Sequence, residues 1–599
     1  MLFRRLLIPA VVAVALIAVP AGSSSPAAIT LAPAFTAAEL NATPGADWIA
    51  NGGSVNNQRY SSLNQITSSN VAGLKEAWHI HLDGSGVKAK YSAEATAIVY
   101  KGVMYIATGN DDVFAVDAAT GARIWTYQSH IDQTINTACC GWDNRGVAVA
   151  EGKVYVAQLD GTLVALDQMT GGVVWSVPVF NWREGVTLTS APLYYNGVVY
   201  VGSTGGEYGF RGSITAYSAA NGNFLWRFFT VPQPGDIGGQ TWAPGPLGFA
   251  TGGGTVWNTP SVDVARNTIT FTTGNAAPWS GRGPGQNLFT SSYVSLNATT
   301  GQIVWWYQLI HHDIWDYDCP APTVQFDVTI AGVLRNGIGE PCKTGWLYLL
   351  DRSTGKPLIG INEVKVPQMK SNNTWPTQPT PVGEPFSQQC AKKSAFTGKQ
   401  AKMSGYPVKI GCIWQPYDAT HPAAFAPSAQ GGADWNPASY NPDTQLMYVC
   451  AGDSDIAQLG IPAAKQTSDY LAGKTFFGIL FGGFHFYRGY IKAMDVTTNK
   501  VVWTATYKSP CYSGTFTTAG NLVFAGQVNG EYDAFDAKTG QKVWSSQLDA
   551  GVAAPGMTYS ANGKQYVAIY AGGSTFAFEA TITGEKFPHG DSLYAFALP

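Results

Sequence analysis

One short pattern recurs along the whole chain and limits what the chain can fold into. It consists of a small apolar stretch, an Asp or a substitute, a Thr-Gly or Asn-Gly turn, and a Trp eight residues after the Asp position. Each copy predicts a strand, a tight turn whose Gly or Asn accepts a positive φ, and a second strand. The clear copies end at Trp125, Trp175, Trp226, Trp305, Trp503 and Trp544, and degenerate copies lie around Trp78 and at residues 349–359.

The spacing of the copies predicts the architecture. The repeat Trp residues at 125, 175 and 226 lie 50 and 51 residues apart, and those at 503 and 544 lie 41 apart. Periods of this size, each holding about four short strands, are typical of β-propellers. Six clear and two degenerate copies therefore predict an all-β, eight-bladed β-propeller of four-stranded blades. Each Trp is expected to pack against the Gly-containing turn of the next blade, and the longer gaps leave room for loop insertions on the face that carries the site.

The composition excludes several other classes. Hydrophobic residues make up 45% of the chain and charged residues only 13%, with a formal net charge of −3. This apolar content can offset the entropy of the chain and excludes intrinsic disorder. The glycines have no three-residue period and no charged heptads occur, which excludes collagen and coiled coils. No Lys/Arg cluster of the kind that tracks phosphates is present, so nucleic acid is not an expected partner.

The N-terminus predicts export. Arg4 and Arg5 precede an apolar run over residues 6–21, followed by small and polar residues. This run is short for a spanning helix and is interrupted by prolines, so it indicates a signal peptide over residues 1–28, with a retained anchor as the alternative. One propeller domain is expected over residues 29–599. We expect a periplasmic or secreted protein with no membrane span after cleavage.

The eight cysteines fit export, because disulfides persist outside the cytosol. None occurs in a C-x-x-C-H arrangement, so no covalent haem site is expected. Cys390 and Cys412 bracket a loop that they could staple. For the adjacent Cys139 and Cys140, a bond would strain a small ring, so spacing alone favours two separate thiols. The sequence leaves open how the others pair: Cys319, Cys342, Cys450 and Cys511.

The most distinctive motif outside the repeat is HHDIWDYDCP at residues 311–320. It places Asp313, Asp316 and Asp318 within six positions of a chain that is poor in acids. Carboxylates this close share a cation or raise one another's pKa, and both outcomes suit a base beside a hard metal ion. A solvated acidic loop is the alternative, but the interleaved aromatic residues argue against full exposure.

Two weaker motifs could complete a set of oxygen ligands. Asn275 follows a predicted strand in TTGNAAPW, and Glu207 lies among glycines in GSTGGEYGFRG, although simple turns are the alternative for both. Together with Asp316, they would suit Ca²⁺ or a lanthanide and not Zn²⁺. We therefore assign His311 and His312 a structural or hydrogen-bonding role.

These motifs, taken together, resemble the pyrroloquinoline quinone (PQQ) dependent alcohol dehydrogenases, which are eight-bladed periplasmic propellers. ACCGWDNRG, GGEYGFRG, TTGNAAPW and HHDIWDYD occur in the family's order, and the likeness extends from residue 45 to residue 573. The resemblance implies that PQQ lies between Trp257 and a disulfide joining Cys139 to Cys140. It thus reverses the interpretation of the two cysteines from spacing alone.

The resemblance also implies roles for other residues. Lys343 stands where the family places Lys or Arg near the quinone carbonyls. Asp318 stands where lanthanide-using members carry an extra carboxylate. Because sugar-oxidising and polyol-oxidising relatives share a similar stretch, Asp318 does not settle which metal binds, and we favour Ca²⁺. The metal ligands matching the family are Glu207, Asn275 and Asp316, with Asp318 as the additional one. The residues expected to contact PQQ are Glu94, Arg145, Thr189, Thr204, Lys343, Trp435 and Asn436.

The activity implied by the resemblance is oxidation of alcohols to aldehydes or ketones. Asp316 would take the alcohol proton while hydride moves to PQQ, with the metal ion as Lewis acid and Lys343 stabilising charge on the quinone oxygen. With no haem c domain, electrons would pass to a separate acceptor, most simply a periplasmic c-type cytochrome. The alternatives are a PQQ dehydrogenase of sugars, polyols or polyvinyl alcohol, and a non-catalytic propeller scaffold. The substrate would depend on insertion loops such as residues 365–425 and 456–486.

Overall fold

The structure of the protein is a computed structural model that describes residues 28–244, 252–462, 477–575 and 584–599. The predicted signal peptide lies outside these residues except for Ala28. Within the described part, no helix is long and apolar enough to cross a membrane. Its helical segments are α1 (Ala37–Asn41) and the 3-10 turns η1 (Val71–Gly73), η2 (Trp182–Glu184), η3 (Gly239–Thr241), η4 (Lys370–Asn372) and η5 (Gly398–Ala401).

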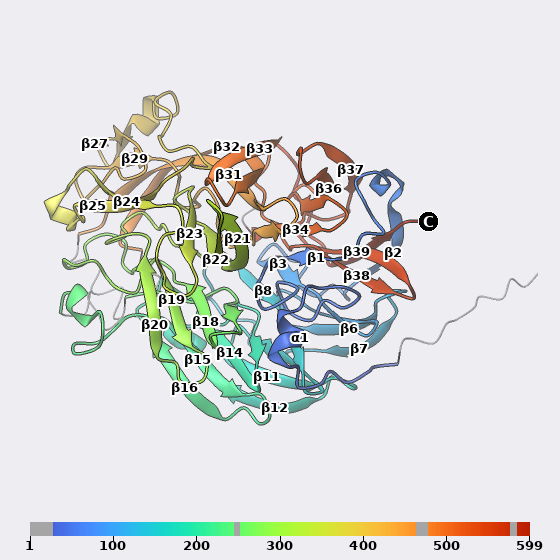
Figure 1. The fold of residues 1–599 in the computed structure, drawn as a ribbon. Coiled ribbons are helices and arrows are strands. Elements are labelled where there is room, and N and C mark those ends of the chain that lie inside the picture. Colours follow the sequence, from blue (N-terminus) through green and yellow to red (C-terminus); the bar gives the residue numbers. More distant parts are fainter. Residues whose placement is uncertain (1–27, 245–251, 463–476, 576–583) are drawn as a thin grey trace, which may run out of the picture.

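Eight sheets lie around a ring, and each forms one blade (Figure 1). In the first four blades of the chain, neighbouring strands are antiparallel, as the strand-turn-strand repeat predicts. The all-β, eight-bladed architecture is thus confirmed. The first four blades in the chain are β4 (Ile98–Tyr100), β5 (Val103–Ala107), β6 (Val113–Asp117), β7 (Arg123–Tyr127); β9 (Ala148–Ala150), β10 (Lys153–Ala157), β11 (Thr162–Asp167), β12 (Val173–Pro178); β13 (Leu193–Tyr195), β14 (Val198–Gly202), β15 (Ser213–Ser218), β16 (Phe224–Phe229); and β17 (Ser261–Asp263), β18 (Thr268–Thr272), β19 (Ser292–Asn297), β20 (Ile303–Gln308).

The second half of the ring is less regular. One blade gains β28 and β29 along one edge, and another gains β1 (Tyr60–Ser61), which pairs in parallel with β34. The four remaining blades are β21 (Val324–Ile330), β22 (Val333–Pro341), β23 (Leu347–Asp351); β28 (Lys409–Ile410), β29 (Ala423–Phe425), β30 (Ser439–Asn441), β31 (Leu446–Gly460), β32 (Ile479–Asp495), β33 (Lys500–Tyr507); β34 (Thr515–Thr518), β35 (Leu522–Gly526), β36 (Glu531–Asp536), β37 (Lys542–Gln547); and β38 (Met557–Ala561), β39 (Lys564–Ala571), β40 (Ser592–Ala597), β2 (Lys75–His81).

The ring closes where the two ends of the chain meet. Strand β2, from the N-terminal part, pairs antiparallel with β40, which is the last strand of the chain. In Figure 1 the blue β2 belongs to the same blade as the red β38 and β39. The outermost strand of this blade is therefore supplied by residues almost the whole chain length away.

At six of the blade junctions the repeat Trp packs against the turn glycine of the next blade, as predicted. A Cβ added to Gly121 would lie 2.7 Å from the ring of Trp78, and one added to Gly540 would lie 2.5 Å from Trp503. Because these turns also need a positive φ (73° and 72°), only glycine fits. The same contact recurs for Trp125 with Gly171, Trp175 with Gly222, Trp226 with Gly301, and Trp305 with Gly355.

One blade departs from the predicted four strands. Strands β21 to β23 form a three-stranded sheet, and the degenerate repeat copy after β23 makes only an isolated bridge between Leu350 and Pro357. Pro357 stands where the fourth strand begins in the clear copies, and Ile359 stands in place of the Trp. Proline cannot donate to a strand ladder, and without the Trp the segment lacks its anchor on the next blade.

Insertions follow this blade, as the long repeat gap predicts. They contain two small hairpins, and the hairpin of β31 and β32 extends well beyond the length of an ordinary blade strand. These elements lie on one side of the ring (Figure 1). The small hairpins are β24 (Ile361–Lys365) with β25 (Thr377–Pro381), and β26 (Lys402–Met403) with β27 (Tyr406–Pro407).

All eight cysteines form disulfides. Cys390 bonds to Cys412 and staples the insertion loop, as expected. Cys139 bonds to Cys140, so the interpretation from spacing alone was wrong and the one from the resemblance is confirmed. The fold supports this pair because Cys140 holds a left-handed φ of 67° and its carbonyl accepts from Thr575. The other two bonds join Cys319 to Cys342 and Cys450 to Cys511.

Candidate active site

A cavity of about 420 Å³ gathers most of the residues singled out from the sequence. They come from loops of different blades and from the parallel pair of β3 (Tyr91–Thr96) and β8 (Trp142–Gly146), which lies near the centre of the ring (Figure 1). Two of the predicted residues, Asn275 and Asn436, do not line it. The predicted residues that do are Glu94, Cys139, Cys140, Arg145, Thr189, Thr204, Glu207, Trp257, Asp316, Asp318, Lys343 and Trp435.

The acidic motif at residues 311–320 folds around the carboxylate of Asp313. This buried carboxylate accepts hydrogen bonds from the backbone N–H of Trp315 (2.8 Å) and Tyr317 (2.7 Å). The tight loop gives Asp316 a positive φ of 69°, an unusual conformation that the surrounding hydrogen bonds must maintain. Asp313 is therefore the residue that shapes the loop, while Asp316 and Asp318 face the cavity.

The two histidines before this loop have the structural role expected from the sequence. Nδ1 of His311 lies 2.8 Å from Oε1 of Gln308, and Nδ1 of His312 lies 2.7 Å from the carbonyl oxygen of Gly285. Burial lowers the pKa of His312 to about 3, so this imidazole is neutral at ordinary pH.

Lys343 is the cation at the centre of the carboxylate cluster. Its Nζ lies 3.0 Å from Asp316 and 2.7 Å from Asp318, and Asp434 is 4.0 Å away. The disulfide between Cys319 and Cys342 ties together the two segments that carry these groups. Burial disfavours the charge of Lys343, but the three carboxylates raise its pKa well above the ordinary value. Lys343 is therefore charged.

The cluster nevertheless holds more negative charge than one lysine can neutralise. Burial, with repulsion from Asp318 and Glu207, raises the pKa of Asp316 well above its usual range against the opposing effect of Lys343. Burial and Asp318 raise the pKa of Glu207 to about 7. A bound cation would relieve this repulsion, and its ligands would all be oxygen atoms, so the residues fit Ca²⁺ or a lanthanide.

Asn275 lies directly behind the cavity wall. Its Oδ1 would be 3.4 Å from a Cβ at Gly206, the residue before Glu207, and its Nδ2 donates to the carbonyl of Ala276 (3.2 Å). The neighbouring Gly274 approaches Asp318, whose Oδ2 would be 3.3 Å from a Cβ at that position. The two glycines therefore leave room for the amide of Asn275 beside Gly206 and for the carboxylate of Asp318 beside Gly274.

A second polar group forms around Arg145. Its guanidinium bonds to Glu94 (2.7 Å), Asp143 (2.7 Å) and Oγ1 of Thr189 (2.7 Å). The chain of bonds continues from Thr189 to the hydroxyl of Thr204, 3.0 Å away. Burial raises the pKa of Glu94 to about 8, against the opposing effect of Arg145. A cation with several hydroxyl donors is well suited to bind the carboxylates and oxygens of an anionic cofactor.

Two flat surfaces complete this part of the cavity. The indole of Trp257 is held by a hydrogen bond from Nε1 to Oδ2 of Asp318 (3.3 Å), and the guanidinium carbon of Arg145 lies 4.9 Å from its ring centre. The Cys139–Cys140 disulfide lines the same cavity. A flat, polyanionic group such as PQQ fits these surfaces and donors.

Two acids that line the cavity, Asp143 and Asp434, were not predicted from the sequence, and the predicted Asn436 does not line it. Asp143 lay within the quoted motif ACCGWDNRG and bonds to Arg145, and Asp434 directly precedes Trp435. Asn436, expected to contact PQQ, points elsewhere, because its Nδ2 donates to the carbonyl of Cys450 (3.0 Å). Its neighbour Asp434, whose carboxylate accepts from Gln430 (2.8 Å), lines the cavity instead.

A wall of apolar side chains forms another side of the cavity, and the repeat does not predict it. Trp279, at the end of the TTGNAAPW motif, contacts the rings of Phe477 (5.1 Å) and Phe481 (5.7 Å). Ile456 and Phe484 lie along the same wall. Apart from Trp279, these residues belong to the β31–β32 region, within the insertion loop 456–486 that the sequence singled out.

Comparison with known proteins agrees with the geometry. The family model described as "Glucose/ethanol/alcohol dehydrogenase, beta-propeller domain" of the PQQ proteins matches residues 48–474 and 487–567. The chain belongs to the PQQ-dependent alcohol dehydrogenases. This family accounts for both the eight-bladed ring and the motifs at the cavity, and it confirms the resemblance drawn from the sequence.

Individual relatives cover nearly all of this dehydrogenase. The quinoprotein alcohol dehydrogenase PedH of Pseudomonas putida is 34% identical over 92% of the chain and 91% of its own length. The quinohemoprotein alcohol dehydrogenase of Comamonas testosteroni is 34% identical over 94% of the chain and 77% of its own length. Among solved structures, a europium-containing methanol dehydrogenase superposes with a TM-score of 0.79 at 27% identity, covering 93% of this chain and 99% of the other.

Proposed function

We propose that this dehydrogenase is a periplasmic quinoprotein that oxidises apolar alcohols to aldehydes or ketones and passes the electrons to a separate acceptor. The observation that carries the proposal is the cluster of Asp316, Asp318 and Lys343, which faces the same cavity as Trp257 and the Cys139–Cys140 disulfide. A non-catalytic scaffold would need neither the buried charges nor the paired cysteines.

The cofactor would be held by the groups that line the cavity. Trp257 and the disulfide would cover its two faces, while Arg145, Thr189 and Thr204 would bind its polar edge. When bound, PQQ supplies the two-electron oxidant, and the metal ion supplies Lewis acidity. The protein's part is to orient these groups and to keep water out of the cavity.

Asp316 is the proposed base. Its carboxylate would take the hydroxyl proton of the alcohol at Oδ1 or Oδ2, and Lys343, 3.0 Å from Oδ2, would keep a positive charge beside it during this transfer. Lys343 would also stabilise negative charge that develops on a nearby oxygen of the cofactor. Its raised pKa supports this role, because the ammonium stays protonated throughout.

The proposed metal ligands are Glu207, Asn275 and Asp316, with Asp318 as an additional fourth ligand for a lanthanide. We favour Ca²⁺. The carboxylate of Asp318 already has two partners, Lys343 at 2.7 Å and Nε1 of Trp257 at 3.3 Å. A dication needs fewer anionic ligands than a trivalent ion does, so Asp318 can keep both partners.

The apolar wall supports alcohols over sugars and polyols. Trp279, Phe477 and Phe481 pack against each other where a substrate would extend away from Asp316. A sugar or polyol needs hydrogen-bond partners for each buried hydroxyl, and these rings provide none through their faces. An aliphatic or aromatic substrate would instead gain binding free energy, because it would cover the apolar wall and shield it from water.

The electron acceptor is proposed to be a separate c-type cytochrome. The chain has no C-x-x-C-H segment that could attach haem covalently. Signal-peptide cleavage would deliver the enzyme to the periplasm, where such cytochromes are found and where its disulfides would persist.

The direct test is reconstitution of the purified protein with PQQ and either Ca²⁺ or La³⁺, followed by dye reduction with 1-hexanol, benzyl alcohol, glycerol and glucose. We expect reduction with the first two alcohols and much slower reduction with glycerol and glucose. Faster turnover of glycerol or glucose would contradict the substrate proposal. Absence of both PQQ absorbance and dye reduction would contradict the activity itself.

A further inference from the structure

Two histidines on the strand that closes the ring are not explained by the repeat or by the active site. His79 and His81 follow the degenerate repeat Trp78 by one and three positions. The six clear copies carry no histidine at either position; they have Thr126, Ser176, Arg227, Trp306, Thr504 and Ser545 at the first, and Gln128, Pro178, Phe229, Gln308, Thr506 and Gln547 at the second.

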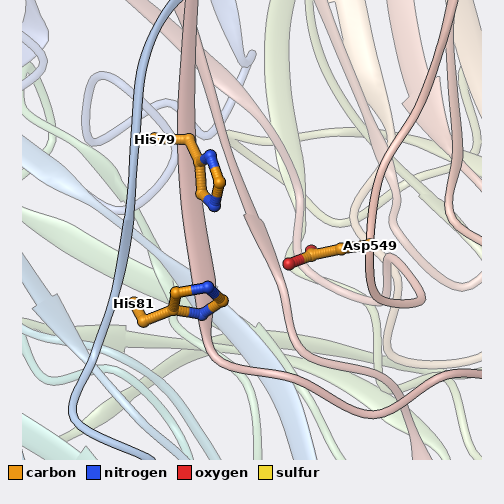
Figure 2. Close-up of side chains that lie close together, drawn as sticks. All are labelled: His79, His81 and Asp549. Carbon is orange, nitrogen blue, oxygen red and sulfur yellow. The ribbon is translucent and has the colours of Figure 1, made fainter.

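Both histidines point away from the blade core. Side chains alternate along a strand, so the buried Trp78 faces the next blade while His79 and His81 are on the outer face of β2. Asp549, from the loop after β37 in the preceding blade, approaches the same face. Figure 2 shows the two imidazole rings and the carboxylate pointing toward one space, and one possible ligand atom of each lies within 4.8 Å of the others.

Neighbouring groups orient His81. Its Nδ1 lies 2.9 Å from Oδ1 of Asp591, whose side chain is only 6% exposed. A carboxylate that accepts from one ring nitrogen fixes the tautomer and leaves the other nitrogen as a metal ligand, an arrangement that most protein metal sites use. Among the described residues, no hydrogen-bond partner occupies Nε2 of this ring, so Nε2 is available.

The other two side chains are held in a similar way. The ring of His79 stacks on Tyr594 with 4.6 Å between ring centres, and its Nδ1 lies 3.4 Å from Glu76. Asp549 accepts a hydrogen bond at Oδ2 from the hydroxyl of Ser592 (2.7 Å), and the hydroxyl of Tyr594 interacts with the same carboxylate. Both Tyr594 and Ser592 are on β40, directly opposite the two histidines in the strand pairing.

We propose that His79, His81 and Asp549 bind a divalent transition metal ion, with Zn²⁺ as the best fit, at the closure of the propeller ring. Two imidazole nitrogens and one carboxylate oxygen suit Zn²⁺, with water in the remaining position, and are a poor set for Ca²⁺ or a lanthanide. The protein thus has two sites of opposite preference: the oxygen-lined cavity and this imidazole site. Because the ligands come from β2 and from the preceding blade, the ion stabilises the folded, closed ring.

The test uses the tag-free, full-length enzyme loaded with PQQ and Ca²⁺, so that the cavity is already occupied. Zn²⁺ titration by calorimetry, together with the thermal unfolding midpoint, should show one saturable site and a Zn²⁺-dependent rise in Tm. His79→Ala or His81→Ala should each weaken Zn²⁺ binding by about tenfold or more, and the double variant should lose both binding and the Tm rise.

His421→Ala is the matched control, because His421 is an exposed histidine (70%) that lies 2.9 Å from Asp418 but belongs to no group of three potential metal ligands among the described residues. It should bind Zn²⁺ like the parent. Because His79, His81 and His421 are exposed, all the variants should keep the parent's circular dichroism spectrum and, in the absence of Zn²⁺, the parent's Tm. The proposal is overturned if the parent binds no Zn²⁺, or if the double variant still binds it.

Discussion

The two halves of the cavity differ in chemistry and in origin. The charged half, made of Asp316, Asp318, Lys343 and Glu207, is attached to blade loops and tied by the Cys319–Cys342 disulfide. The apolar wall, made of Trp279, Ile456, Phe477, Phe481 and Phe484, comes mainly from the long β31–β32 hairpin outside the regular repeat. This difference leads us to propose that the blade loops position the chemistry and that the insertion selects the substrate.

The largest effect is expected for the base in the charged half. Asp316→Asn should lower kcat by about 10³-fold, since a positioned general base contributes on the order of 10²–10⁴, while PQQ stays bound. Steady-state dye reduction and the cofactor absorbance measure the two properties. Asp327→Asn, at an exposed carboxylate (55%) on β21, should leave kcat unchanged. Normal turnover in Asp316→Asn would show that Asp316 is not the base.

A somewhat smaller loss is expected when the cation of the charged half is removed. Lys343→Gln should lower kcat by about 10²-fold, in the range for loss of one group that stabilises developing charge. It also leaves buried carboxylates without their cation, so Tm should fall as well. Lys343→Arg should restore part of both properties because it keeps the charge. If Lys343→Gln lowered Tm but not kcat, Lys343 would have only a structural role.

The metal preference can be tested at Asp318. In Asp318→Ala, activation by La³⁺ should require about tenfold more metal than in the parent, because a trivalent ion benefits most from the additional carboxylate. The Ca²⁺ requirement should change less. Activation titrations of the metal-stripped protein, reloaded with each ion, measure both values. An equal loss for the two ions would contradict the assignment of Glu207, Asn275 and Asp316 as the main Ca²⁺ ligands.

The effect expected in the apolar wall is no larger than the effect at Asp318, and it should depend on the substrate. Phe481→Ala should lower kcat/KM for 1-hexanol and benzyl alcohol by about tenfold, the cost of losing apolar contact of about 1–3 kcal/mol. Ethanol, which is too short to reach along the wall, should be oxidised nearly as before. Phe229→Ala, at an exposed ring (37%) on β16, is the control. An equal loss for ethanol would mean that the wall supports the charged half and does not select the substrate.

The blade architecture could be predicted because the repeat is local. The Trp and the Gly of each turn lie within one short segment, and their regular return along the chain predicts the number of blades and the packing of Trp78 on Gly121. The exception was the degenerate copy at residues 349–359, where Pro357 and the missing Trp leave a sheet of three strands.

Much of the charged half could also be found from the sequence. Asp316 and Asp318 stood out because acids are rare in the chain and these two lie close together. The Cys139–Cys140 bond needed more than spacing, because the strain of adjacent cysteines argues against it and only the family resemblance indicated it. Asp434 lines the cavity without having been predicted, and Asn436 does not line it, because which neighbouring side chain faces the cavity depends on the local path of the backbone.

The sequence by itself determined the ring of blades, the family and the motifs of the charged half, because each depends on residues within a short segment. Only the tertiary structure decided which of those segments contact one another. It brought Lys343 between Asp316 and Asp318, placed the rings of the β31–β32 region over the cavity, and set Asp549 beside His79 and His81. These contacts join residues from different blades, and chain folding brings them together in ways that no local pattern records.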